Sequence, residues 1–415
     1  MKYVVILGDG MADRPLAELG GMTPLEYAKT PMMDALSEMG EVGMVKTVPD
    51  DMKPGSDVAN LAVLGYDPRA NYSGRSPLEA LSIGIDMKDT DIAMRVNVVT
   101  LAEPEGAAGD VPFEELVITD HSSGEISTAD AAILLDALRG ELENDEFQFY
   151  VGTSYRHCCI WNRGKVLNFA QPHDHLGEVI GQYLPDASGN EDNREDARRF
   201  TEMMKKSYAI LKDHPLNRER IRNGLNPANC LWFWGAGTKP QLSPFIERTG
   251  KRGVMISAVD LLKGIGRGAG MKVCEVEGAT AQLETNYEGK AQAALDALLK
   301  EDYDLAYIHI EAPDEMGHQG SVEKKVKSIE YLDQRLIRPV YEGLQGTDFR
   351  MLVTPDHRTP ICIRTHSGEP VPYILFDSTA IAKNHLHYNE REAEQSGILI
   401  TPGETLMDRL LGKQE

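Results

Sequence analysis

Three short apolar runs in this sequence each end just before a turn that carries a carboxylate. The runs cover residues 3–7 (YVVIL), 305–310 (LAYIHI) and 351–353 (MLV), and the carboxylates that follow them are Asp9, Asp314 and Asp356. Continuous apolar runs of this length, bounded by Gly or Pro, are typical of buried strands in a parallel sheet. Because parallel strands end at one edge of a sheet, the three carboxylates are predicted to meet there. Open α/β sheets place their active sites at that edge.

Helical patterns alternate with these runs. Residues 288–299 have apolar positions at helical spacing, and residues 323–344 predict a longer helix with a break at Pro339. The order strand, helix, strand indicates βαβ units, so the predicted fold class is α/β with a mostly parallel sheet flanked by helices. Further strands are predicted at Cys230–Trp234, Gly253–Ile256, Lys272–Val276 and Tyr373–Phe376.

The chain is long enough for two domains. Its 415 residues exceed one ordinary core, and residues 92–170 mix short β-like runs with one helical stretch, Thr128–Leu142. We therefore expect a smaller α+β domain, residues 68–228, inserted into a main domain formed by residues 1–67 and 229–415.

Composition excludes several classes of partner. A formal net charge of −22 argues against nucleic acid, whose phosphates would be repelled. No segment approaches the roughly 20 apolar residues of a membrane span, and the first apolar run is too short for a signal peptide. The five cysteines form no CxxC pair, so neither a disulfide framework nor a cysteine zinc site is expected. These features predict a cytoplasmic protein, with its oligomeric state left open.

The candidate ligands are individually ambiguous. Asp9 could be an ordinary turn residue, and Ser56 in Lys-Pro-Gly-Ser-Asp could cap the helix that begins there. His318 follows Asp314 by four residues, a spacing that places both side chains on one helix face, as a metal pair requires. Asp356 is followed directly by His357, and His366 could be any exposed loop histidine.

Taken together, the same residues indicate a metal site. Carboxylate oxygens and imidazole nitrogens suit Mn²⁺ in the first place, and also Mg²⁺, Co²⁺ or Zn²⁺. Two such ions about 4 Å apart can clamp the attacking and leaving oxygens of a phosphoryl transfer. A serine hydroxyl at a helix N-terminus beside them, here Ser56, is a suitable nucleophile.

Longer motifs support a family assignment. The chain resembles the cofactor-independent phosphoglycerate mutases of the archaeal type, within the alkaline phosphatase superfamily. The resemblance runs through nearly the whole chain in order, in the segments VILGDGMADRP, KPGSDVANLAVLGYDP, YSGRSPLEA, GTSYRH, PHD, GATAQLETNYEGKA, HIEAPDEMGHQG, TPDHRTP and THSGEPVPY. It implies an alkaline-phosphatase-like main domain that interconverts 3-phosphoglycerate and 2-phosphoglycerate.

The resemblance also implies residue roles. Ser56 would be the phosphorylated nucleophile, and a small phosphorylated carboxylate would be the substrate. One metal would be held by Asp9, Ser56, Asp356 and His357, and the other by Asp314, His318 and His366. The inserted domain would supply basic groups for the substrate, for which the candidates are Arg95, Arg156 and Lys239, with Arg75 and Lys263 as further ones.

Some positions depart from the family pattern and leave alternatives open. These are residues 119–123, Arg358, Ser76 and Ser367. Related proteins phosphorylate small alcohols, so a homoserine kinase is the main alternative, and a phosphatase or a non-enzymatic binding protein are others. The Gly-rich residues 264–270 follow no clear strand and predict a flexible loop rather than a nucleotide-binding one.

Overall fold

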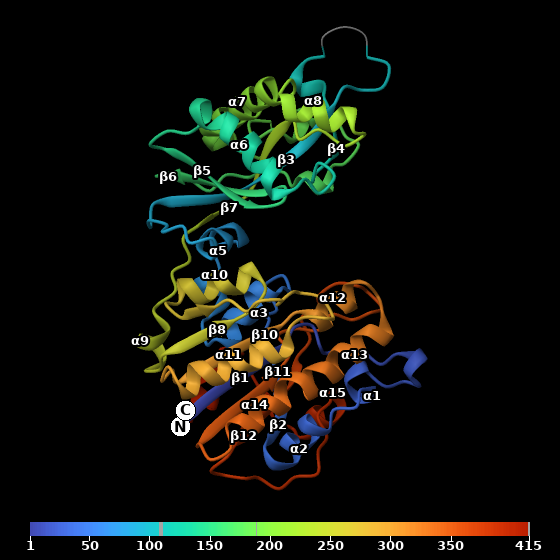
Figure 1. The fold of residues 1–415 in the computed structure, drawn as a ribbon, viewed down its shortest axis with the longest axis vertical. Helices are drawn as coiled ribbons and strands as arrows, with labels where there is room; N and C mark the ends of the chain where they lie inside the picture. The colour runs from blue at the N-terminus through green and yellow to red at the C-terminus, as the bar shows by residue number, and fades with distance from the viewer. Residues whose placement is uncertain (108–110, 188, 414–415) are drawn as a thin grey trace. The chain divides into compact units, whose positions relative to one another are not determined.

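The computed structural model describes residues 1–107, 111–187 and 189–413. The chain forms two compact units (Figure 1). Unit 1 contains Met1–Tyr72 and Gln241–Glu415, and unit 2 contains Ser73–Pro240. Among the described residues, no helix has the length and apolar character that a membrane crossing requires.

The boundaries between the units differ from the predicted ones. They fall after residues 72 and 240, where the sequence suggested 67 and 228. The second difference moves β7 (Cys230–Thr238) out of the main domain, because this strand pairs antiparallel with β3 (Asp91–Ala102) of unit 2. A continuous apolar run shows that a strand is buried but not which sheet it will join.

Unit 1 is built on an eight-stranded sheet in the order β13-β2-β12-β11-β1-β10-β8-β9. Its neighbouring strands are parallel except at β12, which runs antiparallel to β11 and β2. The mostly parallel α/β sheet predicted from the sequence is therefore confirmed. The strands are β1 (Lys2–Gly8), β2 (Glu41–Val45), β8 (Gly253–Ile256), β9 (Lys272–Cys274), β10 (Leu305–Ile310), β11 (Phe349–Thr354), β12 (Val371–Asp377) and β13 (Leu399–Ile400).

Helices cover both faces of this sheet. Val4 and Ile6 of β1 belong to one core with residues of α11, α13 and α14. Side chains alternate along a strand, so Tyr307 of β10 faces the opposite side, where its hydroxyl donates to Asn60 of α3. The main helices are α2 (Pro31–Met39), α3 (Ser56–Val63), α10 (Asp260–Gly268), α11 (Tyr287–Leu299), α12 (Ala312–His318), α13 (Val322–Leu332), α14 (Arg338–Gly343) and α16 (Thr405–Leu411). Shorter ones are α1 (Pro24–Tyr27), α4 (Pro68–Asn71), α9 (Phe245–Thr249) and α15 (Glu390–Gln395).

Two helical predictions need correction. The expected break at Pro339 is instead a π-helical turn over Asp333–Ile337, which joins α13 to α14, and Pro339 lies in the first turn of α14. The helix continues through this turn, where the Arg338 N–H bonds to the Asp333 carbonyl five residues earlier, and the π-helical turn accommodates a proline that cannot donate such a bond. The Gly-rich residues expected to form a flexible loop lie largely within α10, where Gly264, Gly266 and their apolar neighbours are buried. Gly266 allows close packing, since an added Cβ would lie 2.8 Å from Cβ of Met255.

Unit 2 has a five-stranded antiparallel sheet. Its path is β4-β3-β6-β5, and β7 pairs with the other edge of β3. The core buries aromatic residues of the strands against α6 and α7, as expected for an α+β domain. The elements are β4 (Val117–Asp120), β5 (Phe147–Thr153), β6 (Arg156–Asn162), α5 (Arg75–Ser82), α6 (Thr128–Leu142), α7 (Arg194–Leu211) and α8 (Pro215–Arg222).

Candidate functional site

The carboxyl ends of three adjacent strands of unit 1 bring distant residues together. Asp9 follows β1, Asp314 lies in α12 just after β10, and Asp356 follows β11. All three are buried. Gly10 makes the close approach possible: it has φ +58°, and an added Cβ would lie 2.6 Å from Oδ1 of Asp314.

Four side chains converge on one point beside the start of α3. Nε2 of His357 lies 3.2 Å from Oγ of Ser56, 3.5 Å from Oδ1 of Asp9 and 3.4 Å from Oδ2 of Asp356. Oδ1 of Asp9 is buried and has no hydrogen-bond partner among the described residues. Because an unpaired buried oxygen is costly, this atom fits a cation ligand.

Ser56 does not cap its own helix. The N-cap of α3 is Gly55, and Ser56 is the first helical residue. Its hydroxyl instead faces His357 at 3.2 Å. The capping alternative for Ser56 is therefore wrong, and the serine oxygen lies at the positive end of a helix, facing the ligand candidates.

A second group lies around Asp314. Oδ2 of Asp314 is 3.1 Å from Nε2 of His318, and Oδ1 is 3.4 Å from Nε2 of His366. The two Nε2 atoms are only 3.0 Å apart. Nδ1 of His318 lies 3.0 Å from the carbonyl oxygen of Arg364, to which Nδ1–H can donate, and Nε2 is then left free as an acceptor. Two imidazoles and a carboxylate arranged in this way can hold a divalent ion.

The pKa values of the cluster are shifted because several charged groups are buried close together. Burial first, and then Asp356, Glu311 and Asp314, raise the pKa of Asp9 well above its usual value. Burial would also raise the pKa of Asp314, but bonds from His318 and His366 hold it well below its usual value. Asp314 in turn raises the pKa of His318 to about 9. Such opposed shifts within one cluster are typical of functional sites.

Supporting residues that the sequence reasoning missed hold this arrangement. Asn60, one turn after Ser56, donates from Nδ2 to the Ser56 carbonyl at 2.8 Å and to Oδ2 of Asp356 at 2.9 Å. The hydroxyl of Thr359 donates to Oδ1 of Asp314 and lies 3.3 Å from Nδ1 of His357. The i, i+4 spacing of Ser56 and Asn60 is a signal that could have identified the asparagine.

Two further missed residues, His309 and Glu311, border the cluster. Nε2 of His309 lies 2.9 Å from Oδ2 of Asp9 and 3.6 Å from Oε2 of Glu311. Burial, followed by Asp314, raises the pKa of Glu311 to about 7. His309 is the next-to-last residue of the predicted strand 305–310 and Glu311 directly follows it, so their position at the end of this strand was the available signal.

Three of the basic candidates, Arg95, Arg156 and Lys239, belong to unit 2. Arg95 of β3 forms a bidentate ion pair with Glu79, and its guanidinium carbon lies 4.7 Å from the centroid of the Trp234 ring. Arg156, at the start of β6, is exposed. Lys239 lies 3.7 Å from Asp89.

The two further candidates also have acidic partners. Nε of Arg75 in α5 lies 3.6 Å from Oε1 of Glu79. Lys263 belongs to unit 1, where it pairs with Glu275 at 2.7 Å.

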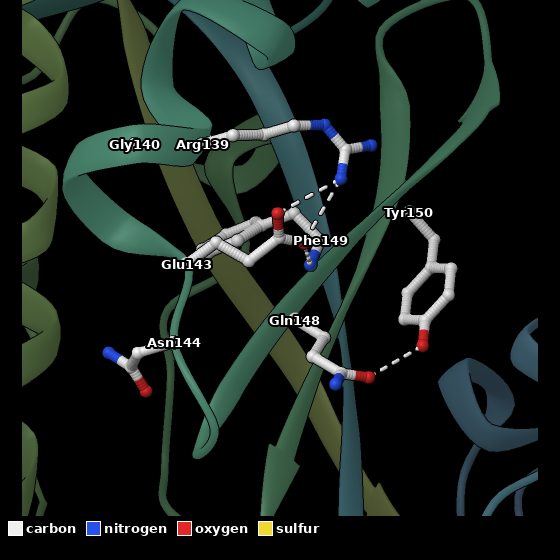
Figure 2. A pocket seen from close by; sticks show the side chains of 7 residues that line it. All are labelled: Arg139, Gly140, Glu143, Asn144, Gln148, Phe149 and Tyr150. Atoms are coloured by element: carbon white, nitrogen blue, oxygen red, sulfur yellow. Dashed lines mark hydrogen bonds and ion pairs between the residues drawn. The ribbon is translucent and has the colours of Figure 1, made fainter.

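A hollow of about 680 Å³ in unit 2 contains none of the predicted site residues (Figure 2). It is lined by Arg139, Gly140, Glu143, Asn144, Gln148, Phe149 and Tyr150. Nη1 of Arg139 donates to both oxygens of Glu143, at 3.1 and 3.0 Å, and the hydroxyl of Tyr150 donates to Gln148 at 2.7 Å. Four of the lining side chains, those of Arg139, Glu143, Gln148 and Tyr150, are thus bonded within the lining itself.

Comparison with known proteins agrees with the motifs. A family model described as 2,3-bisphosphoglycerate-independent phosphoglycerate mutase matches residues 37–217. A probable enzyme of that name from Geobacter sulfurreducens is 46% identical over 416 residues, covering 100% of both chains. The chain belongs to this mutase family. A mutase of that name from Methanosarcina barkeri is 45% identical over 96% of each chain.

Solved structures of similar proteins share the fold of this chain. The PH0037 protein from Pyrococcus horikoshii has a TM-score of 0.80 at 29% identity, and the match covers 100% of this chain and 98% of that one. The cofactor-independent phosphoglycerate mutase from Thermoplasma acidophilum has a TM-score of 0.68 at 25% identity over 99% of each chain. The family assignment made from the sequence motifs is therefore confirmed, and the chain is an enzyme of the mutase class.

Proposed function

We propose that this member of the mutase family interconverts 3-phosphoglycerate and 2-phosphoglycerate through a phosphoserine at Ser56 beside two divalent ions. The main support is the convergence of Ser56 Oγ, His357 Nε2 and the unpaired Asp9 Oδ1. A serine oxygen next to free ligand atoms is the arrangement that phosphoryl transfer to a side chain requires.

The donor set fits two ions. Asp9, Ser56, Asp356 and His357 would hold one, and Asp314, His318 and His366 the other. The donors are oxygen and nitrogen only, which suits Mn²⁺ first, and also Mg²⁺, Co²⁺ or Zn²⁺. When bound, such ions supply electrostatic stabilisation to the transferred phosphoryl group and lower the pKa of a coordinated hydroxyl.

Side chains and backbone groups of the protein provide the nucleophile, bind the phosphate and position the reacting atoms. Ser56 Oγ attacks the phosphorus as its bond to O3 of the substrate breaks, and the 2-hydroxyl of the retained glycerate then attacks the phosphoserine, which releases Ser56. The first residues of α3 present backbone N–H groups that can bind phosphate oxygens. Asn60 donates to both Asp356 and the Ser56 carbonyl. These bonds fix the position of the serine nucleophile relative to Asp356, one of the proposed metal ligands.

Substrate contacts in unit 2 are part of the same proposal. The carboxylate and phosphate of a small phosphorylated acid would bind Arg95, Arg156 and Lys239. Arg156 has the best access because its side chain is exposed, whereas that of Arg95 is only 11% exposed and paired with Glu79. The cytoplasmic location predicted from the sequence belongs to this proposal too; the five cysteines are unpaired.

A direct assay tests the function. Metal-loaded protein is expected to convert 3-phosphoglycerate, measured by coupling to enolase, and Ser56→Ala is expected to abolish turnover. Intact-protein mass spectrometry after rapid quenching should show one added phosphoryl group on the wild type and none on the variant. Phosphorylation of homoserine by ATP, with no turnover of 3-phosphoglycerate, would contradict the proposed substrate. Persistent activity in Ser56→Ala would contradict the phosphoserine.

A further inference from the structure

A fully buried lysine connects two of the loops that carry ligand candidates. The side chain of Lys325 in α13 has no exposed surface, and a lysine is rarely buried unless its charge is paired. Its Nζ donates to Oδ2 of Asp13 at 2.7 Å and to the Thr359 carbonyl at 2.8 Å. The Ala12 carbonyl oxygen lies 3.5 Å from the same nitrogen. One ammonium group therefore contacts both the loop after β1 and the loop after β11.

Asp13 strengthens this connection between the two loops. Its Oδ1 accepts a bond from the Arg14 amide at 2.7 Å, within the loop after β1. The Ile361 amide, in the loop after β11, lies 3.3 and 3.2 Å from the two oxygens of the same carboxylate. The Thr359 amide also donates to the Ala12 carbonyl at 3.2 Å. The buried pair of Lys325 and Asp13 thus joins the two loops through side chains as well as backbone.

Thr359 links the buried pair to the ligand candidates of both proposed ions. Its hydroxyl donates to Oδ1 of Asp314 and lies 3.3 Å from Nδ1 of His357. An added Cβ at Gly317 would lie 2.7 Å from the Thr359 carbonyl oxygen, so α12 packs directly against the oxygen that Lys325 binds. A shift of Thr359 would therefore displace Asp314, proposed for one ion, and His357, proposed for the other.

The energetics of a buried ion pair favour a role in geometry over a role in stability. Removing two charges from water costs about as much free energy as their attraction contributes, so such a pair adds little net stability. Its hydrogen bonds are short and directional, and they fix the positions of the groups that they join. Groups that orient metal ligands from outside the coordination sphere commonly change metal affinity when they are removed.

We propose that Lys325, through its pair with Asp13, is a positioning residue that fixes the ligand-carrying loops after β1 and β11 for both divalent ions. Lys325 supplies no donor atom to either ion, because an ammonium group has no lone pair. The inference rests on the proposed two-metal function.

The first test measures metal affinity in the full-length protein. After metal is removed with a chelator, equilibrium dialysis against Mn²⁺ should give two bound equivalents in the wild type and in Lys325→Met. The affinity of Lys325→Met should be lower by about 10- to 100-fold, because its loops are no longer joined by the buried pair.

Asp333→Asn is the matched control, at another buried charged residue of unit 1. The Asp333 carboxylate accepts bonds from the Met32 and Met33 amides at 3.2 and 2.7 Å, at the start of α2. An asparagine retains only one of the two acceptor oxygens. This variant should therefore have a lower melting temperature but the Mn²⁺ affinity of the wild type.

Hydrogen exchange of the metal-free protein tests the positioning without any bound ion. Lys325→Met should exchange faster than the wild type in residues 9–14 and 356–361. Asp333→Asn should exchange faster in α2 and should leave both loops unchanged. Unchanged exchange of both loops in Lys325→Met would overturn the proposal.

The outcomes separate this proposal from the proposed function. Two equivalents in the wild type and unchanged affinity in Lys325→Met would overturn the role of Lys325 and leave the two-metal function intact. Equal losses of affinity in Lys325→Met and Asp333→Asn would also overturn it, because the effect would then follow from lower stability. Fewer than two equivalents in the wild type would contradict the two-metal function and, with it, this proposal.

A second variant decides if Lys325→Met does not fold, as judged by circular dichroism. Lys325→Met leaves the Asp13 carboxylate buried without its counter-charge, which is strongly destabilising. The double variant Lys325→Met, Asp13→Asn removes both charges and is assessed by the same affinity and exchange measurements.

Discussion

The carboxyl edge of the unit 1 sheet and the surroundings of Arg95 in unit 2 differ in how their charges are compensated. At the sheet edge, Asp9 Oδ1 and Glu311 Oε2 are buried without hydrogen-bond partners among the described residues. In unit 2, Arg95 is bonded to both oxygens of Glu79 and stacks on Trp234. A buried charged group without a partner in the protein indicates a binding site for an ion or ligand. A charged group that is paired within the protein instead stabilises the fold.

The largest expected effect is at the sheet edge. Asp356→Asn keeps the side chain's shape but removes its negative charge, so we expect kcat/KM to fall by about 10³-fold or more. The enolase-coupled assay measures this loss. Asp348→Asn, at the opposite end of β11 and exposed, is the control and should retain activity. Equal loss in both variants would mean that the effect is structural.

Metal binding should stabilise unit 1 alone. Ions that bind the folded state at 100 times their dissociation constant add about 3 kcal/mol to its stability. Hydrogen exchange should therefore slow in β1, β10 and β11 when Mn²⁺ is added to chelator-treated protein, with β5 and β6 unchanged. Equal protection of both units would show that the ions act beyond the sheet edge.

Acid should weaken unit 2 through His157. Burial lowers the pKa of this histidine to about 4, and its usual value is about 6.5. Between these two values the unfolded chain binds more protons, so stability falls as pH drops from 6.5 to 4, by about 2 kcal/mol. His157→Gln should flatten this part of the stability curve, as measured by urea denaturation of the full chain.

A histidine with less burial serves as the comparison for His157. His175→Gln makes the same change in the same unit, at a histidine whose side chain is 24% exposed. An unchanged slope in His157→Gln would contradict the acid prediction.

The smallest effect should distinguish the two arginines. Arg156→Gln removes an exposed charge and is expected to raise KM for 3-phosphoglycerate about 10-fold, with kcat and stability nearly unchanged. Arg95→Gln breaks the pair with Glu79, so we expect it to lower the melting temperature as well. Steady-state kinetics and thermal unfolding of both variants measure the difference. Similar melting temperatures would contradict a scaffold role for Arg95.

Sequence alone determined the elements that depend on local pattern. The apolar runs before Asp9, Asp314 and Asp356 predicted parallel strands, and the rule that such strands end at one edge predicted that the carboxylates would meet. The four-residue spacing of Asp314 and His318 was enough to place both on one face of α12. These inferences depend on periodicity and chain direction, which are local properties of a sequence.

The remaining features depend on the tertiary structure. It assigned β7 to unit 2, because strand pairing depends on residues more than a hundred positions away. It brought Asn60 to Asp356, Thr359 to Asp314 and His309 to Asp9. It also paired Arg95 with Glu79. Side chains meet in this way through packing between elements, and no spacing along one segment encodes which atoms will be left without a partner.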